Sequence, residues 1–276
     1  MDEKFKNVDR FRHALSNLMQ VDRGNFRQVI EGCLNPTPRE RHLTYNYHRA
    51  AINAEMLVSI TDTKQFQAMT MLTRAIFEIS VEMRTILNDK DAAEKIEVFN
   101  NIERLRAATK LVEYTKHHRD APVHSETYKN FLKANEATIR REQKRIWPNE
   151  KMSDVQHWTL KQLPQRAEVL GGVFKQIYHV SYSELSWYVH GGTAGVINLG
   201  ADAFAYLAGI CYKVSADAYS EILETLIREF RLECADDIVR IRIHHARFDP
   251  FAETPAEKAA LLKAMGVELK QPNTSA

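Results

Sequence analysis

Residues 198–231 read NLGADAFAYLAGICYKVSADAYSEILETLIREFR, a run in which apolar side chains recur every three or four positions. This spacing is the period of an α-helix, whereas a half-buried strand would alternate apolar and polar residues. The run therefore predicts one long helix suited to the centre of a helical bundle. Its expected core-facing side chains are Leu199, Phe204, Leu207, Ile210, Val214, Tyr219, Ile222 and Leu226.

The same period extends over the rest of the chain, which only 10 Gly and 8 Pro interrupt. No segment alternates as a strand does, so we expect an all-α, single-domain helical bundle. We place the bundle at residues 37–247, with extra N-terminal helices in 1–36 and a short C-terminal helical tail in 248–276. The other helices are expected at residues 3–20, 25–34, 38–60, 64–87, 91–116, 125–146, 160–190, 236–247 and, as a weaker pattern, 256–265.

Capping residues predict several of these boundaries. Thr37 is a favourable N-cap, and Pro38 fits the first helical position after it. Asp62 and Gln65 have the spacing of a capping box for the next helix. Two glycines at 191 and 192 predict the end of the helix that begins near residue 160.

Composition excludes several classes of protein. With 38 Lys and Arg against 36 Asp and Glu, the net charge of +2 gives no global attraction to nucleic acid or membranes. The three widely spaced cysteines, Cys33, Cys211 and Cys234, indicate neither a disulfide framework nor a metal site. The first residues lack a signal-peptide core, and the most apolar stretch, 203–212, is about half a membrane span. We therefore expect a cytoplasmic protein without a membrane partner, a metal or a cofactor.

Polar side chains repeat every four residues along the helix expected at 160–190: Tyr178, Tyr182, Ser186 and His190. This spacing places two phenols, a hydroxyl and an imidazole on one slowly drifting stripe. The negative end of the helix dipole should favour protonated His190 and raise its pKa, which suits a general acid or a phosphate-binding group. Gly191 and Gly192 would let a ligand approach the backbone.

A purely structural interpretation of this stripe remains open. Tyr178 and Tyr182 could pack with Trp187 in the core, and Ser186 could bond back to its own helix. In that interpretation His190 is only a favourable residue at the helix C-terminus.

Arg74 and Glu78 form a second candidate cluster, one turn apart on a helix that is otherwise rich in apolar residues. Glu82 continues their stripe. Two interpretations fit: a partly buried ion pair, or a solvated face with pairs between residues four apart.

A third candidate is the basic patch on the helix expected at 125–146. It consists of Arg140, Arg141, Lys144 and Arg145 beside Trp147 and could hold phosphates. Acidic neighbours favour a solvated helix face instead.

The segment from Arg74 to Glu78, which reads RAIFE, the following Asp89, and the stripe Tyr182-x3-Ser186-x3-His190-Gly191 together resemble the motifs of a bacterial family known as domain of unknown function 5677. The resemblance spans about residues 54–231. It implies an all-helical fold in which the two motif helices pack together. Arg74, Glu78, Tyr182, Ser186 and His190 would then share one site.

The pattern is similar, more distantly, to the helical HEPN ribonucleases, toxins and defence effectors that cut RNA with an Arg and a His. In those proteins the two residues lie on one helix, four to six residues apart. This chain departs from that pattern, because the stretch from Tyr182 to Ser186 occupies the position of the Arg. Arg74 would have to substitute from another helix.

The resemblance therefore implies a HEPN-like protein that acts on RNA or a nucleotide, as a metal-independent ribonuclease toxin or phage-defence effector. His190 would be the general acid or base, Arg74 would stabilise phosphate charge, and Glu78 would orient Arg74. Tyr178, Tyr182, Ser186, Gly191 and Gly192 would contact substrate, and we expect a homodimer. The rival hypotheses are a non-enzymatic sensor or adaptor that binds a small anion or a protein partner, and a polar network that only fixes helix register.

Overall fold

The computed structural model describes residues 8–33, 35–118, 125–189 and 200–232. Within these ranges the chain is helical and contains no strand, which confirms the prediction of an all-α bundle. It forms two compact units, one made of the chain up to Asn88 and from Arg166 onward, and the other of Asp89–Gln165. The predicted boundaries near residues 36 and 247 stay a prediction.

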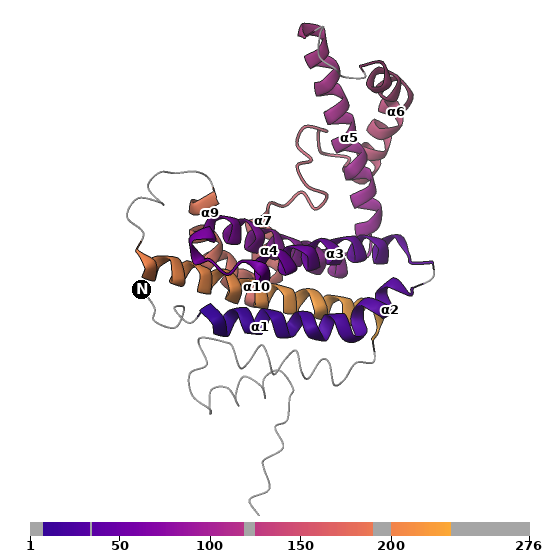
Figure 1. The fold of residues 1–276 in the computed structure, drawn as a ribbon. Coiled ribbons are helices and arrows are strands. Elements are labelled where there is room, and N and C mark those ends of the chain that lie inside the picture. The colour runs from indigo at the N-terminus through magenta and orange to yellow at the C-terminus, as the bar shows by residue number, and fades with distance from the viewer. Residues whose placement is uncertain (1–7, 34, 119–124, 190–199, 233–276) are drawn as a thin grey trace, which may run out of the picture. The chain divides into compact units, whose positions relative to one another are not determined.

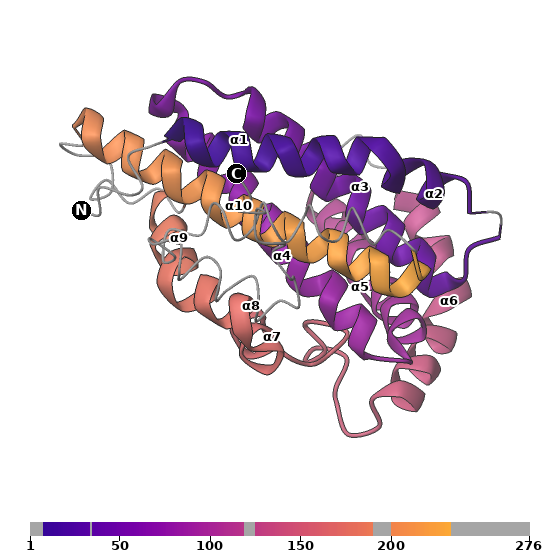
Figure 2. The same ribbon diagram turned by 90° about the horizontal axis from the view of Figure 1, so that it is seen from below.

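The long helix expected from the first sequence segment is the centre of the first unit. Helix α10 (Ala201–Phe230) packs against α4 (Phe66–Asn88), α1 (Val8–Val21) and α3 (Pro38–Ser59), and α1 lies alongside it in both views (Figures 1 and 2). Each fully buried Leu or Ile stabilises the fold by about 1.5–3 kcal/mol. The predicted core residues Leu207, Ile210, Val214, Tyr219, Ile222 and Leu226 are all buried, Phe204 is half-buried, and Leu199 lies outside the described residues.

The predicted cap of α3 is confirmed. The Thr37 hydroxyl accepts the backbone N–H of Glu40 at 3.2 Å, and the Glu40 carboxylate accepts the N–H of Thr37 at 2.6 Å. The Asp62 cap differs, because its carboxylate accepts the N–H of Lys64 and begins a short 3-10 turn, η3 (Thr63–Gln65), ahead of α4. The helix expected at residues 25–34 begins earlier than predicted. A π-helical turn, η2 (Asp22–Phe26), follows α1 directly and leads into α2 (Arg27–Glu31).

The prediction of one continuous helix over residues 160–190 is wrong. The segment consists of α7 (Leu163–Leu170), α8 (Gly172–Ile177), the π-helical turn η4 (Tyr178–Tyr182) and α9 (Ser183–Val189). Gly171 separates α7 from α8 with φ +67° and ψ −160°, a conformation that side-chain-bearing residues rarely adopt. The break falls at this glycine because it can take that conformation without a Cβ clash.

The second unit is built on α5 (Ala92–His117) and α6 (Ser125–Ile146), which pack against each other. Ile96, Ile102 and Leu105 of α5 and Ile139 of α6 are buried. The segment after α6 adds two buried indoles, Trp147 and Trp158, together with Val155. This segment is fixed by Gln143, whose side-chain amide donates to the carbonyls of Trp147 and Glu150 at 3.3 and 2.9 Å.

Among the helices that the structure describes, none combines the length and the apolar character that crossing a membrane requires.

Candidate functional site

Arg74 and Glu78 lie one turn apart on α4, as their spacing requires, with Arg74 Nη2 and Glu78 Oε1 3.6 Å apart. The Arg74 side chain is only 16% exposed, whereas that of Glu78 is 46% exposed. Of the two interpretations that the sequence left open, this burial favours the partly buried pair. Glu78 forms the side of the cluster that faces solvent.

Tyr182 of η4 joins this pair. Arg74 Nη2 donates to the Tyr182 hydroxyl at 2.8 Å, and the hydroxyl donates to Glu78 Oε1 at 2.6 Å. The Arg74 guanidinium also lies over the Tyr182 ring, 4.8 Å from its centroid, a cation–π contact. Two segments 108 residues apart therefore meet through one phenol. We call Arg74, Glu78 and Tyr182 the Arg–Tyr–Glu cluster.

Burial, together with the hydrogen bond to the Glu78 carboxylate, raises the pKa of Tyr182 to about 12, and Arg74 opposes this shift. A phenol with this pKa is neutral near pH 7. It can therefore donate to a carboxylate and accept from a guanidinium at the same time, but it is a poor general base. Its chemical role in the cluster is to hold Arg74 and Glu78 in fixed positions.

Two aromatic rings support Tyr182. The Tyr178 ring stacks on it at 5.3 Å between centroids with planes 21° apart, and Phe77 of α4 packs against it at 5.4 Å. Ser186 donates to the backbone carbonyl of Tyr182 at 2.8 Å, which is the bond within the helix that the structural interpretation expected. Trp187 is 76% exposed, so it does not join the tyrosines in the core.

The π-helical turn η4 was not anticipated from the sequence. A π-turn contains one residue more than the α-helical repeat allows, so side chains beyond it are rotated relative to those before it. Such turns are frequent at functional sites, and this one ends at Tyr182. The evenly drifting stripe predicted for residues 178–190 is therefore interrupted at the residue that contacts α4.

The remaining predicted site residues, His190, Gly191 and Gly192, lie outside the described residues. In sequence, His190 comes directly after Val189, the last residue of α9. The structure thus brings together Arg74, Glu78 and Tyr182 and places Tyr178 and Ser186 beside them.

Sequence reasoning missed a second ion pair on the same stripe of α4. Arg166 of α7 donates to Glu82, and the two side chains are 12% and 20% exposed. Glu82 stood out in the sequence as the continuation of the Arg74–Glu78 stripe, but nothing identified a partner 84 residues away. The pair fixes α7 to α4 one turn beyond Glu78.

A buried carboxylate in η2 was also missed. Asp22 accepts hydrogen bonds from the hydroxyls of Tyr47 and Tyr219, the latter at 2.9 Å, and all three side chains are buried. Burial raises the pKa of Asp22, and the two phenols oppose the shift. Because this cluster ties η2 to α3 and α10 inside the core, we assign it a structural role.

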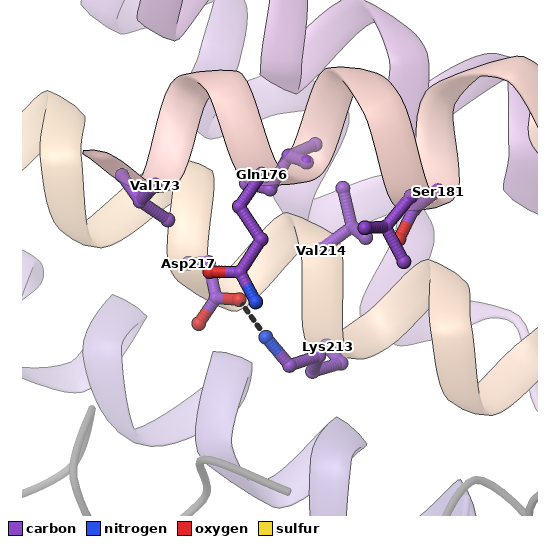
Figure 3. Close-up of a pocket in the computed structure, with 8 residues that line it drawn as sticks. Val173, Gln176, Ser181, Lys213, Val214 and Asp217 are labelled. Atoms are coloured by element: carbon purple, nitrogen blue, oxygen red, sulfur yellow. Dashed lines mark hydrogen bonds and ion pairs between the residues drawn. The ribbon is translucent and has the colours of Figure 1, made fainter. Parts of the chain in front are cut away.

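Figure 3 shows a small cavity between α8–η4 and α10, with the ion pair of Lys213 and Asp217 at its edge. Its volume of about 30 Å³ has room for one or two water molecules. This cavity is too small for a nucleotide. In the part of the chain that the structure describes, no group of three or more His, Cys, Asp or Glu residues is arranged to hold a metal ion.

Fold and site together define a helical bundle in which a guanidinium and a carboxylate of α4 contact a phenol of η4. Residues 47–202, more than half of the chain, match the model of a family of unknown function (DUF5677), and the chain therefore belongs to that family. The matched region contains the whole Arg–Tyr–Glu cluster. No curated protein and no solved structure matches the chain.

Proposed function

We propose that this protein is a HEPN-like endoribonuclease that cuts RNA without a metal ion, as a toxin or a phage-defence effector. The observation that carries the proposal is the 2.8 Å contact between Arg74 Nη2 and the Tyr182 hydroxyl. It joins the two segments whose motifs suggested RNA chemistry, and Tyr182, the residue that makes the contact, precedes His190 by eight positions in the sequence.

In the proposed reaction the 2′-hydroxyl of the RNA attacks the neighbouring phosphorus. The bond from phosphorus to the 2′-oxygen forms, the bond to the 5′-oxygen breaks, and the products carry a 2′,3′-cyclic phosphate and a 5′-hydroxyl. His190 takes the proton of the 2′-hydroxyl or gives one to the departing 5′-oxygen, and water completes the other transfer. Arg74 stabilises the negative charge that develops on the phosphate oxygens.

Tyr182 and Glu78 are positioning residues in this scheme. Glu78 lies 3.6 Å from Arg74, and the neutral Tyr182 phenol bridges the two. A guanidinium fixed in this way loses little conformational entropy when a phosphate binds. Tyr178, Ser186, Gly191 and Gly192 remain the proposed substrate contacts, and a homodimer remains the proposed assembly.

The experiment compares expression of wild-type protein, His190→Ala and Arg74→Ala in bacteria. His179→Ala and Arg49→Ala are matched controls, because both side chains are exposed and lie outside the Arg–Tyr–Glu cluster. We expect growth arrest and RNA loss with the wild type and with both controls, and neither with the two site variants. Harmless expression and intact RNA with every variant would remove the ribonuclease proposal.

A second candidate function is a non-enzymatic sensor or adaptor that reads a small anion. The observation in its favour is that the Tyr182 ring, the Tyr182 hydroxyl and the Glu78 carboxylate hold the Arg74 guanidinium in place. A cation fixed in this way can bind an anion without a catalytic residue beside it. Thermal shift of the purified protein with inorganic phosphate tests this function: stabilisation that Arg74→Ala abolishes, without RNA loss in cells, supports the sensor. If Arg74→Ala only unfolds the protein, the cluster is a structural network.

A further inference from the structure

The helical pair of the second unit has an open groove of about 690 Å³, separate from the cluster discussed above. Arg106 and Lys110 of α5 and Arg140 of α6 line it, and Ser153 and Gln156 add polar groups from the segment after α6. One carboxylate, Glu103, also lines the groove. The groove therefore presents three cations and one anion.

The arginines of the groove are held in place by their neighbours. Arg106 donates to Glu103 and to the backbone carbonyl of Met152, and Arg140 donates through Nε and Nη2 to Glu136 at 2.9 and 2.7 Å. With Glu136 included, three cations still face two carboxylates. Lys110 is exposed to solvent, so the excess positive charge lies on an accessible surface.

An exposed aromatic residue follows the groove-lining Lys110 on α5. Tyr114 follows Lys110 by one helical turn, so it lies on the same face of the helix, and it is 50% exposed. Its ring stacks on His118 with centroids 4.1 Å apart and planes 6° apart. On α6, the exposed Lys133 lies two turns before Arg140 on one face. One face of α5 thus presents Lys110 and Tyr114, and one face of α6 presents Lys133 and Arg140.

This combination favours one class of ligand. Single-stranded nucleic acid binds to surfaces where spaced cations follow the phosphates and exposed aromatic rings stack on bases. A free phosphate would use the cations but would leave the Tyr114 ring in water. We infer that the groove lined by Arg106, Lys110 and Arg140, together with Tyr114 one helical turn beyond Lys110, binds single-stranded nucleic acid.

Fluorescence anisotropy with a labelled DNA strand of about 12 nucleotides tests the inference. DNA lacks the 2′-hydroxyl, so it cannot be cut by the reaction proposed above, and an RNA strand of the same sequence is measured in the His190→Ala background. Titrations at several salt concentrations give the dependence of affinity on salt. Lys110→Ala and Arg140→Ala should each reduce the slope of log K against log salt by about 0.7, the value for one lost phosphate contact on a single strand.

Tyr114→Ala should weaken binding by roughly 5- to 150-fold without changing that slope, because stacking releases no counterions. Arg104→Ala is the matched control: it is exposed on α5, but six residues from Lys110 place it on another face. Circular dichroism checks that all variants fold. The inference is overturned if the wild type does not bind in a saturable way, if Arg104→Ala has the same effect as Lys110→Ala, or if duplex DNA binds more tightly than the single strand.

These outcomes are independent of the proposed ribonuclease. Arg74→Ala lowers cleavage at least about a hundredfold in that proposal, whereas here it should leave the affinity for the DNA strand and the salt slope of binding unchanged. A protein that binds DNA strands but cuts no RNA would refute the first proposal and support this one.

Discussion

Replacing Tyr182 by Phe removes one oxygen from the centre of the Arg–Tyr–Glu cluster. The ring remains, so its stacking on Tyr178, its packing on Phe77 and its contact with the Arg74 guanidinium should persist. Two charge-assisted hydrogen bonds are lost, at 2.8 Å from Arg74 and 2.6 Å to Glu78. The substitution therefore isolates the hydroxyl.

The magnitude follows from the exposure of the two partners. Hydrogen bonds to charged groups contribute about 1.5–3 kcal/mol each. The Glu78 side chain is 46% exposed and forms hydrogen bonds with water after the substitution, so its bond to Tyr182 contributes less than this range. The Arg74 side chain is only 16% exposed and gains few hydrogen bonds to water in exchange. We expect the free energy of unfolding to fall by about 2 kcal/mol.

Urea denaturation followed by circular dichroism measures this loss, and Tyr178→Phe is the matched control. The Tyr178 ring stacks on Tyr182, but its hydroxyl makes no hydrogen bond within the described residues. Its loss should therefore change stability by less than about 0.5 kcal/mol. Equal stability of wild type and Tyr182→Phe, or equal losses in both variants, would refute the role we assign to the Tyr182 hydroxyl.

Three further predictions concern other parts of the fold. Because burial raises the pKa of Asp22 above its unfolded value, the free energy of unfolding should fall as pH rises from about 4 through the raised pKa. In Asp22→Asn the urea midpoint should change less with pH over that interval, and a pH profile equal to that of the wild type would contradict this. Gly171→Ala should lower the free energy of unfolding by about 1–3 kcal/mol in thermal or urea denaturation, because φ is +67°. Nothing lies within 4 Å of the added Cβ, so this loss would come from backbone strain alone. A neutral effect would exclude the strain. Burial raises the pKa of Cys211 to about 12, so mass spectrometry after thiol labelling near pH 8 should find Cys211 unmodified until urea is added; labelling in the native state would show that the site opens.

Much of the fold could be predicted because helix periodicity and capping are local properties. The core face of α10 and the cap at Thr37 follow from spacing within a few residues. The break at Gly171 could not be located, since an isolated glycine within a helical pattern is often tolerated. The π-turns also escaped, because one inserted residue leaves no clear trace in an apolar pattern.

The candidate site was predicted in part. Arg74 and Glu78 were identified by their spacing, and the family resemblance suggested that Tyr182 would join them. Local spacing alone does not indicate which distant helix supplies a partner, and for this reason the pairing of Glu82 with Arg166 and that of Asp22 with Tyr219 were not anticipated. The groove between α5 and α6 likewise depends on packing: Arg140 appeared only as one member of a basic patch.

The most direct test of the proposed function is cleavage of a labelled RNA by the purified protein in the presence of a chelator. We predict fragments that end in a 2′,3′-cyclic phosphate, with cleavage abolished in His190→Ala and reduced at least about a hundredfold in Arg74→Ala, since loss of a charge-stabilising group in a reaction of this kind costs about that much. RNA that stays intact, or cleavage that Arg74→Ala leaves unchanged, would contradict the claim that Arg74 and His190 form one site.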